Sequence, residues 1–307
     1  MIESANPTHG STHGFQGHDS FVRTRSDCSA QQAVADAVSA LFVPGSRPDR
    51  FSKAASSATD IVIFDLEDAV APAQKADARA NVAAALSPDT GLRALVRTNP
   101  AGTPHYAADI EALCEVARYK AHGLLGFMVA KAETRDAIRD LASWTLPLDL
   151  AVVPLIESAL GLVNSHDLAK VPGVTRLAFG AIDFALDIDA GSDDRFLDHA
   201  RSVLVLASRA AGLSAPLDSP STEVKTMRRV SDSARLARSF GFGGKMCIHP
   251  TQVAEVNAAF RPTAQEIAWA ERIVGCDEAV LQMDGQMVDR PVIERAKRIL
   301  QRVSIAK

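Results

Sequence analysis

Two acidic side chains stand where apolar, strand-like runs end, and their types suit a metal site. Glu157 ends the run AVVPLI, and Asp183 lies four residues beyond the run RLAF. Two carboxylates at neighbouring strand ends suit a hard cation such as Mg²⁺, which prefers oxygen ligands and keeps several of its own waters. Either acid taken alone is as well explained as a loop carboxylate or a helix N-cap. We therefore predict that the pair binds Mg²⁺.

A second group of charged residues follows two other apolar runs. Arg97 comes after ALV, and Asp65, Glu67 and Asp68 come after IVIF. Arg97 could clamp a substrate carboxylate with two parallel hydrogen bonds, or it could form a structural bridge to an acid of the preceding run. Strand alternation predicts that some of the three acids face Arg97 and that the others point away.

Strand-like runs and helix-like segments alternate along most of the chain. The runs span residues 39–45, 60–67, 93–99, 125–131, 150–157, 175–183, 213–219 and 244–250. This α/β pattern predicts a (β/α)8 TIM barrel, in which the strand ends line one mouth. An open doubly wound sheet is disfavoured, because the turn VPGSRPDR has one glycine in place of GxGxxG. Arg47 and Lys131 would lie at the same mouth, as substrate-binding cations or as solvated rim charges.

The chain divides into three regions by composition. Residues 1–36 are rich in Ser, Thr, Gly and His without a sustained apolar period, which predicts a disordered tail. Residues 37–262 form the expected barrel. Residues 263–307 predict a C-terminal extension of a helix, a hairpin that turns at Asp284-Gly285 and a last helix near Pro291. One role considered for this extension is a lid over a neighbouring subunit.

Composition limits the function classes. The net charge of -4 over 307 residues gives no basis for binding nucleic acid or an anionic membrane. The four cysteines form no CxxC pair, which disfavours a disulfide scaffold or a zinc site. Without an apolar run of about 18 residues, no membrane span is predicted. We expect a cytoplasmic protein.

Ordered motifs carry a family resemblance. LFVPGSRPDRFSKA, IVIFDLEDAV, LVRTNP, VVPLIESALGL, LAFGAIDFALDI, GFGGKMCIHPTQV and DGQMVDRP resemble the citrate lyase beta subunit (CitE-like) or HpcH/HpaI aldolase family, including malyl-CoA and citramalyl-CoA lyases. The resemblance runs from about residue 39 to 300. The segment APLDSPSTEV and the long N-terminal tail depart from the family pattern.

The resemblance implies an activity and partners. It implies a trimeric (β/α)8 barrel that binds Mg²⁺ and cleaves a 3-hydroxyacyl thioester into a 2-keto acid and an acyl thioester through an enolate. The substrate would be an acyl-CoA or acyl-carrier-protein thioester, and citrate lyase alpha and gamma subunits are further expected partners. Two alternatives remain: a coenzyme A-independent aldolase on a hydroxy-keto acid, and a non-catalytic barrel subunit of a lyase complex.

The resemblance also implies roles for particular residues. Glu157 and Asp183 would be the metal ligands, and Arg97 would contact the keto-acid moiety. The other implied site residues are Asp65, Glu67 and Arg47 around the substrate, and Lys245, His249 and Pro250 around the nucleotide part of coenzyme A.

Asp289 has two interpretations. By resemblance it matches an acid that some relatives bring into a neighbouring subunit's site. Without the resemblance, Asp289 begins the last helix as an N-cap-type residue before Arg290 and Pro291.

Overall fold

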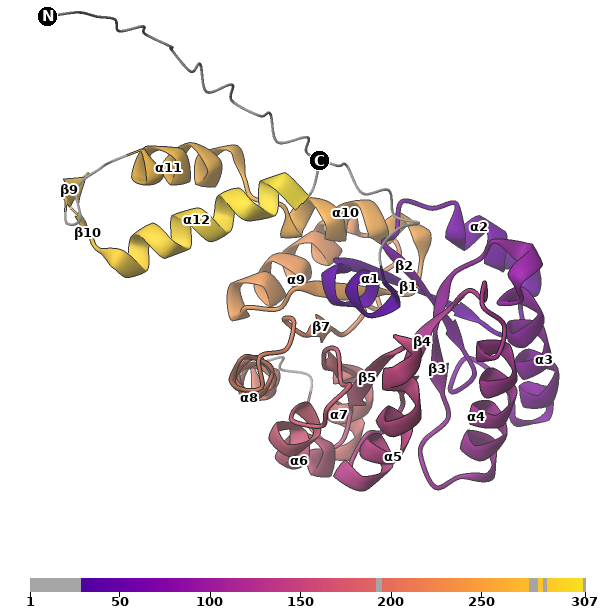
Figure 1. Cartoon of the computed structure of the whole chain (residues 1–307). Coiled ribbons are helices and arrows are strands. Elements are labelled where there is room, and N and C mark those ends of the chain that lie inside the picture. The colour runs from indigo at the N-terminus through magenta and orange to yellow at the C-terminus, as the bar shows by residue number, and fades with distance from the viewer. Residues whose placement is uncertain (1–28, 192–194, 276–280, 284–285, 306–307) are drawn as a thin grey trace, which may run out of the picture.

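Parallel strands close into a barrel in the computed structural model, which describes residues 29–191, 195–275, 281–283 and 286–305 (Figure 1). The strands are β1 (Ser39–Pro44), β2 (Ile61–Asp65), β3 (Ala94–Thr98), β4 (Leu124–Val129), β5 (Ala151–Ile156), β6 (Ala178–Phe179), β7 (Leu217–Asp218) and β8 (Gly244–Cys247). Each pairs in parallel with the next, and β8 pairs back to β1. The predicted (β/α)8 barrel is confirmed, and each predicted run overlaps one strand.

Helices cover the outside of the barrel. They are α2 (Phe51–Ala55), α3 (Lys75–Ala85), α4 (Pro104–Ala117), α5 (Arg135–Thr145), α6 (Ala159–Ala169), α7 (Ala181–Asp187), α8 (Phe196–Ala210), α9 (Met227–Phe240) and α10 (Pro250–Phe260). The sequence sets their ends: Thr103 caps α4 by accepting the Tyr106 N–H, and Gly241 ends α9 with a φ of 104°. Short 3-10 turns are η2 (Pro48–Arg50), η3 (Pro72–Gln74), η4 (Pro88–Thr90) and η5 (Leu146–Leu148).

Strand alternation divides the apolar residues into an inner and an outer core. Ile63 and Leu95 belong to the inner cluster, whereas Phe64 and Val96 pack in the outer cluster with the helices. Asp65 and Arg97 follow Ile63 and Leu95 by two positions, so both continue the inward side. Two charged side chains are thereby directed into the mouth of the barrel.

Helix α1 (Ala30–Asp36) closes the opposite end of the barrel. Its Val34 is fully buried in the inner core, and the Ala30 N–H donates to Asp149, just before β5. The buried Arg176 donates to the carbonyls of Val34 and Ala37 at 3.0 and 2.7 Å. The prediction of a disordered tail to residue 36 is therefore wrong for residues 30–36, while residues 1–28 lie outside the described residues.

The extension forms a second small core. Helices α11 (Ala264–Val274) and α12 (Arg290–Ile305) pack together through Ala270, Ile273, Ala296 and Ile299, and β9 (Leu281–Met283) pairs antiparallel with β10 (Gln286–Val288). The predicted helix, paired strands and last helix are present and project to one side of the barrel, while the predicted turn at Asp284-Gly285 lies outside the described residues (Figure 1). Of the helices in the described residues, none combines the length and apolar character that a membrane span needs.

Candidate active site

Arg97 is the centre of the charged group at the barrel mouth. Its Nε and Nη2 donate to the two Asp65 oxygens at 2.7 and 2.6 Å, and Nη1 lies 3.1 Å from Glu67 Oε2. The guanidinium also covers the Phe42 ring at 4.8 Å. Burial lowers the pKa of Arg97, but hydrogen bonds and charge from Asp65 and Glu67 outweigh burial and raise the pKa above its ordinary value. Arg97 is therefore a fixed positive charge.

Asp65 and Glu67 differ in the groups that they contact. Besides Arg97, Asp65 accepts the N–H groups of Glu67 and Ala69, at 2.9 and 3.2 Å, so it acts as a structural anchor. Glu67 instead lies between Arg97 and Lys131, whose Nζ donates to Oε1 at 2.8 Å. Burial raises the pKa of Glu67 although both cations lower it. Glu67 therefore takes up a proton more readily than an ordinary glutamate.

Glu157 carries an unpaired buried oxygen. The side chain is 2% exposed, and Oε1 accepts the Lys131 N–H at 2.7 Å. Oε2 is buried without a hydrogen-bond partner among the described residues. Burial raises the pKa of Glu157 to about 8, although Arg97 and the Lys131 N–H lower it. A bound cation would stabilise the ionised carboxylate, so this oxygen fits a metal ligand.

Gly180, between β6 and α7, provides the space beside this oxygen. A Cβ added at Gly180 would lie 2.5 Å from Glu157 Oε2 and 2.7 Å from Glu157 Cβ. Residues with larger side chains would therefore displace the carboxylate. Asp183 follows in the first turn of α7, and its side chain is half-buried. Within the described part of the chain, no cluster of three or more His, Cys, Asp or Glu side chains forms a metal site, so the Glu157 and Asp183 pair remains a prediction.

Lys131 contacts both Glu157 and Glu67. Its backbone has a φ of 47°, in the left-handed region that non-glycine residues seldom adopt. This conformation accompanies the N–H contact to Glu157, while Nζ reaches Glu67. Burial lowers the pKa of Lys131, but Glu67 raises it by more, so the ammonium stays charged. Asp68, 4.0 Å from Nζ, is exposed at the rim.

Comparison with known proteins decides the family. Residues 38–250 match the family model described as HpcH/HpaI aldolase/citrate lyase. The chain belongs to this family.

Family members of known name and structure cover most of the chain. A citrate lyase subunit beta-like protein of Mycobacterium tuberculosis is 36% identical over 280 residues, covering 87% of this chain and 95% of that protein. An L-malyl-CoA/beta-methylmalyl-CoA lyase of Cereibacter sphaeroides is 31% identical, covering 86% and 94%. The crystal structure of M. tuberculosis CitE with magnesium, acetoacetate and coenzyme A has a TM-score of 0.76 at 33% identity, covering 88% of this chain and 99% of that one. The chain is therefore a lyase of this HpcH/HpaI family.

The HpcH/HpaI site also depends on residues that the sequence pattern did not indicate. Lys75 Nζ donates to the carbonyls of Leu66 and Glu67 and to Asn99 Oδ1, at 2.9, 3.0 and 2.6 Å. Asn99 in turn donates to Asp109 at 2.7 Å. Together they fix the loop that carries Glu67. The sequence could have indicated Asn99 as a site residue, because it is a polar residue directly after β3. Lys75 is the first residue of a helix and does not follow a strand, so the strand-end pattern does not indicate it.

The expectation for Lys245 is contradicted. Its side chain is 3% exposed, and its Nζ forms an ion pair with the equally buried Asp218. Arg201 of α8 lies 3.7 Å from the same carboxylate, and Cys247, two residues further, packs in the outer core. Lys245 therefore faces the helix layer outside the strands. Because this ammonium is enclosed, it cannot contact a ligand at the mouth.

Three predicted residues at the mouth side stand apart from the central network. Arg47 is about half exposed and forms a two-bond pair with Asp49, at 2.9 and 2.7 Å. His249 and Pro250 are exposed at the start of α10, where His249 Nδ1 accepts the Thr251 N–H and takes part in a capping box. Their contact with a substrate stays a prediction.

Asp289 lies at the junction of β10 and α12, the end of the extension that Figure 1 shows far from the barrel. Its Oδ1 accepts the Val292 N–H at 3.4 Å and its carbonyl accepts the Ile293 N–H, as expected for a helix cap. Asp289 therefore takes no part in the site of its own chain. Two further acids lie after Asp183: Asp187, the last residue of α7, accepts the Ala159 N–H at 2.7 Å, and Asp189 is exposed.

Proposed function

We propose that this lyase is Mg²⁺-dependent and cleaves a 3-hydroxyacyl thioester of the citryl-, citramalyl- or malyl-CoA type into a 2-keto acid and an acyl thioester. The observation that carries the proposal is the buried, unpaired Oε2 of Glu157 next to Arg97 at the mouth of the barrel. The related structure with magnesium, acetoacetate and coenzyme A and the related malyl-CoA lyase support it.

Glu157 and Asp183 are the proposed metal ligands. When bound, Mg²⁺ would polarise the substrate hydroxyl and its neighbouring carboxylate. Arg97 lies close enough to Glu157 to lower its pKa, so the same cavity holds a fixed positive charge for a substrate carboxylate. Such a charge in a water-poor site stabilises the negative charge that develops during cleavage.

Glu67 is the proposed base. Its raised pKa suits it to take the proton of the substrate hydroxyl. As the hydroxyl oxygen becomes the carbonyl of the keto acid, the electron pair of the breaking C–C bond moves to the thioester, which becomes an enolate. The enolate carbon then needs one proton. We assign its delivery to Asp289 of a second copy, because Asp289 of the same chain lies in the extension away from the mouth.

The assembly and the thioester site complete the proposal. A homotrimer would bring the extension of one copy over the mouth of another, and citrate lyase alpha and gamma subunits would be further partners. At the other end of the substrate, the exposed side chains of His249 and Pro250 at the start of α10 and of Arg47 after β1 are the proposed contacts of coenzyme A. A cytoplasmic location is proposed with these substrates.

A panel of thioesters tests the proposal. Citryl-CoA, citramalyl-CoA and malyl-CoA are incubated with the protein, with Mg²⁺ or with EDTA, and the released keto acid is measured. Release that requires Mg²⁺ and is lost in Glu157→Gln supports the proposal, while Asp189→Asn, an exposed acid close in sequence to Asp183, serves as the control. Cleavage of a free hydroxy-keto acid alone would indicate the coenzyme A-independent aldolase. Absence of product from every substrate would indicate a non-catalytic subunit.

A further inference from the structure

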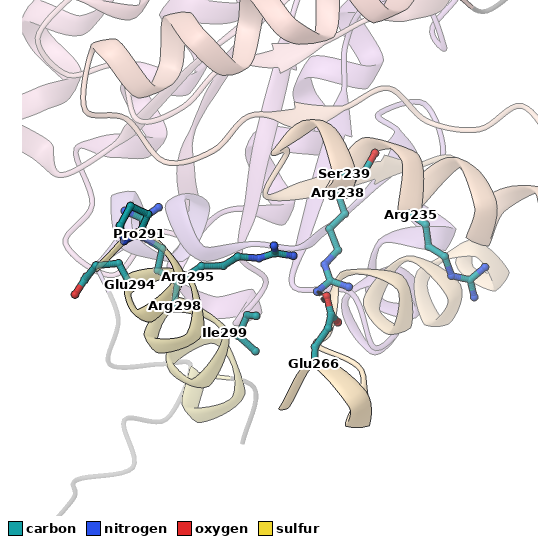
Figure 2. Close-up of a pocket in the computed structure, with 9 residues that line it drawn as sticks. All are labelled: Arg235, Arg238, Ser239, Glu266, Pro291, Glu294, Arg295, Arg298 and Ile299. Carbon is teal, nitrogen blue, oxygen red and sulfur yellow. Dashed lines mark hydrogen bonds and ion pairs between the residues drawn. The ribbon is translucent and has the colours of Figure 1, made fainter. Parts of the chain in front are cut away.

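A cleft of about 750 Å³ lies between α9 of the barrel and helices α11 and α12 of the extension (Figure 2). Arg235 and Arg238 line it from the last two turns of α9, the end that leads into the start of β8. The strand ends with Glu157 and Arg97 lie at the other end of the barrel. The cleft is therefore separate from the proposed active site.

Two pairs of arginines line this cleft. Arg235 and Arg238 on α9, like Arg295 and Arg298 on α12, are three residues apart, so each pair shares one helix face. Figure 2 shows the α9 residues and the α12 residues on opposite sides of the cleft. The cleft thus brings positive charge from the barrel and from the extension to one cavity.

The acids of the cleft neutralise part of this charge. Both Glu266 oxygens accept from Arg238, at 2.9 and 3.0 Å, and Oε2 also accepts the Thr263 N–H. Glu294 pairs with Lys297 at 3.1 Å. With four arginines and two glutamates, the lining has a formal excess of two positive charges.

The excess charge resides on α12. Within the described residues, Arg295 and Arg298 form no ion pair closer than 4 Å; Arg295 lies over the Trp269 ring at 5.5 Å. Both are exposed, so an anion can reach them. Guanidinium groups bind phosphate oxygens in a two-bond geometry, and the cleft has the size of ordinary small-molecule sites, roughly 300–1,000 Å³.

We propose that this cleft binds a diphosphate-type anion, held by Arg295 and Arg298, because Arg238 is paired with Glu266 and Arg235 with Asp232. The anion would come from inorganic pyrophosphate or from a phosphorylated metabolite such as a nucleoside diphosphate. Binding would connect α12 to α9 at a point where the Arg238 and Glu266 pair already joins the extension to the barrel.

Isothermal titration of the full chain in phosphate-free buffer with EDTA tests the site. Pyrophosphate is expected to bind once per chain, and the double variant Arg295→Gln/Arg298→Gln should bind it at least tenfold more weakly. The matched control is Arg228→Gln/Arg229→Gln, which removes the same charge from exposed side chains at the other end of α9. Glu157→Gln should bind pyrophosphate like the native protein. Unchanged melting temperatures verify that the variants fold.

Three results would overturn the proposal: no pyrophosphate binding, equal weakening in the α9 control, or loss of binding in Glu157→Gln. A titration with ADP and with adenosine identifies the source of the anion. ADP binding that depends on Arg295 and Arg298, without adenosine binding, supports a phosphorylated metabolite. Pyrophosphate binding without ADP binding supports the inorganic anion.

Discussion

Gly180→Ala tests whether the position of the Glu157 carboxylate controls metal binding. The added Cβ would lie 2.5 Å from Glu157 Oε2. Ordinary contacts between such atoms are at about 3.4 Å or more, so the carboxylate must shift by roughly 1 Å. The Lys131 N–H still holds Oε1, so the shift changes the direction of Oε2 in the cavity.

We expect Gly180→Ala to weaken Mg²⁺ binding by about 10- to 100-fold, in line with the loss of supporting contacts around other metal ligands. Overpacking should also lower the free energy of unfolding by about 1–3 kcal/mol. The Mg²⁺ affinity is measured from the initial rate and from the calorimetric heat as functions of Mg²⁺ concentration. The free energy of unfolding is measured by urea denaturation.

Gly191→Ala is the matched control, because a Cβ at Gly191 would meet no atom of the described residues within 4 Å. It should leave the Mg²⁺ dependence unchanged. If Gly180→Ala binds Mg²⁺ like the native protein, the proposal that Glu157 is a metal ligand is wrong. If both variants lose affinity equally, the contact with Oε2 is not the cause.

Three further changes test other parts of the structure. Because burial raises the Glu157 pKa from 4.5 to about 8, the metal-free folded protein should lose stability as pH rises through that range, and Mg²⁺ binding at pH 7 should release a proton. Calorimetric titration with Mg²⁺ in buffers of different ionisation enthalpy measures the number of protons released. Equal proton release by Glu157→Gln would show that Glu157 is not the source of the proton. Arg97→Lys should lower kcat by about 10²- to 10³-fold, since lysine cannot form the two-bond contact, and a native rate would refute that role. Arg176→Met should lower the free energy of unfolding by about 2–4 kcal/mol, because buried carbonyls lose their donor; an unchanged denaturation midpoint would count against this.

The strands were predictable because each is a short apolar run between helix-like segments. The weakest cases were β6 and β7, where the runs predicted seven or more residues and the structure has two-residue strands. Strand ends give way to loops when backbone groups bond elsewhere, as where Ser219 accepts the Ala181 N–H. Such long-range contacts cannot be read from local pattern.

The site was predictable as a set of strand-end residues, but not in its contacts. Alternation predicted only that some of the three acids after β2 face Arg97, and the structure shows that these are Asp65 and Glu67. The same rule applied to Lys245 would have placed it with Cys247 in the outer layer. The prediction that Lys245 binds coenzyme A came instead from its place in the family motif GKMCIHP. It was wrong, because Lys245 is buried against Asp218.

Two other features depended on partners distant in sequence. Helix α1 is short and was included in the tail, since what fixes it is Arg176 and the inner core, about 140 residues away. The unpaired oxygen of Glu157 is likewise a property of packing, and sequence spacing gives no sign of it.

The main-chain N–H of Lys131 donates a hydrogen bond to Glu157, whereas the Lys131 ammonium donates to Glu67. Every residue except proline carries a main-chain N–H, so the ammonium can be exchanged without losing the hydrogen bond to Glu157. Glycine and asparagine tolerate the left-handed backbone there at least as well as lysine. Position 131 is thus a place where an engineer can retune the charge that meets an incoming substrate while leaving the anchorage of Glu157 intact.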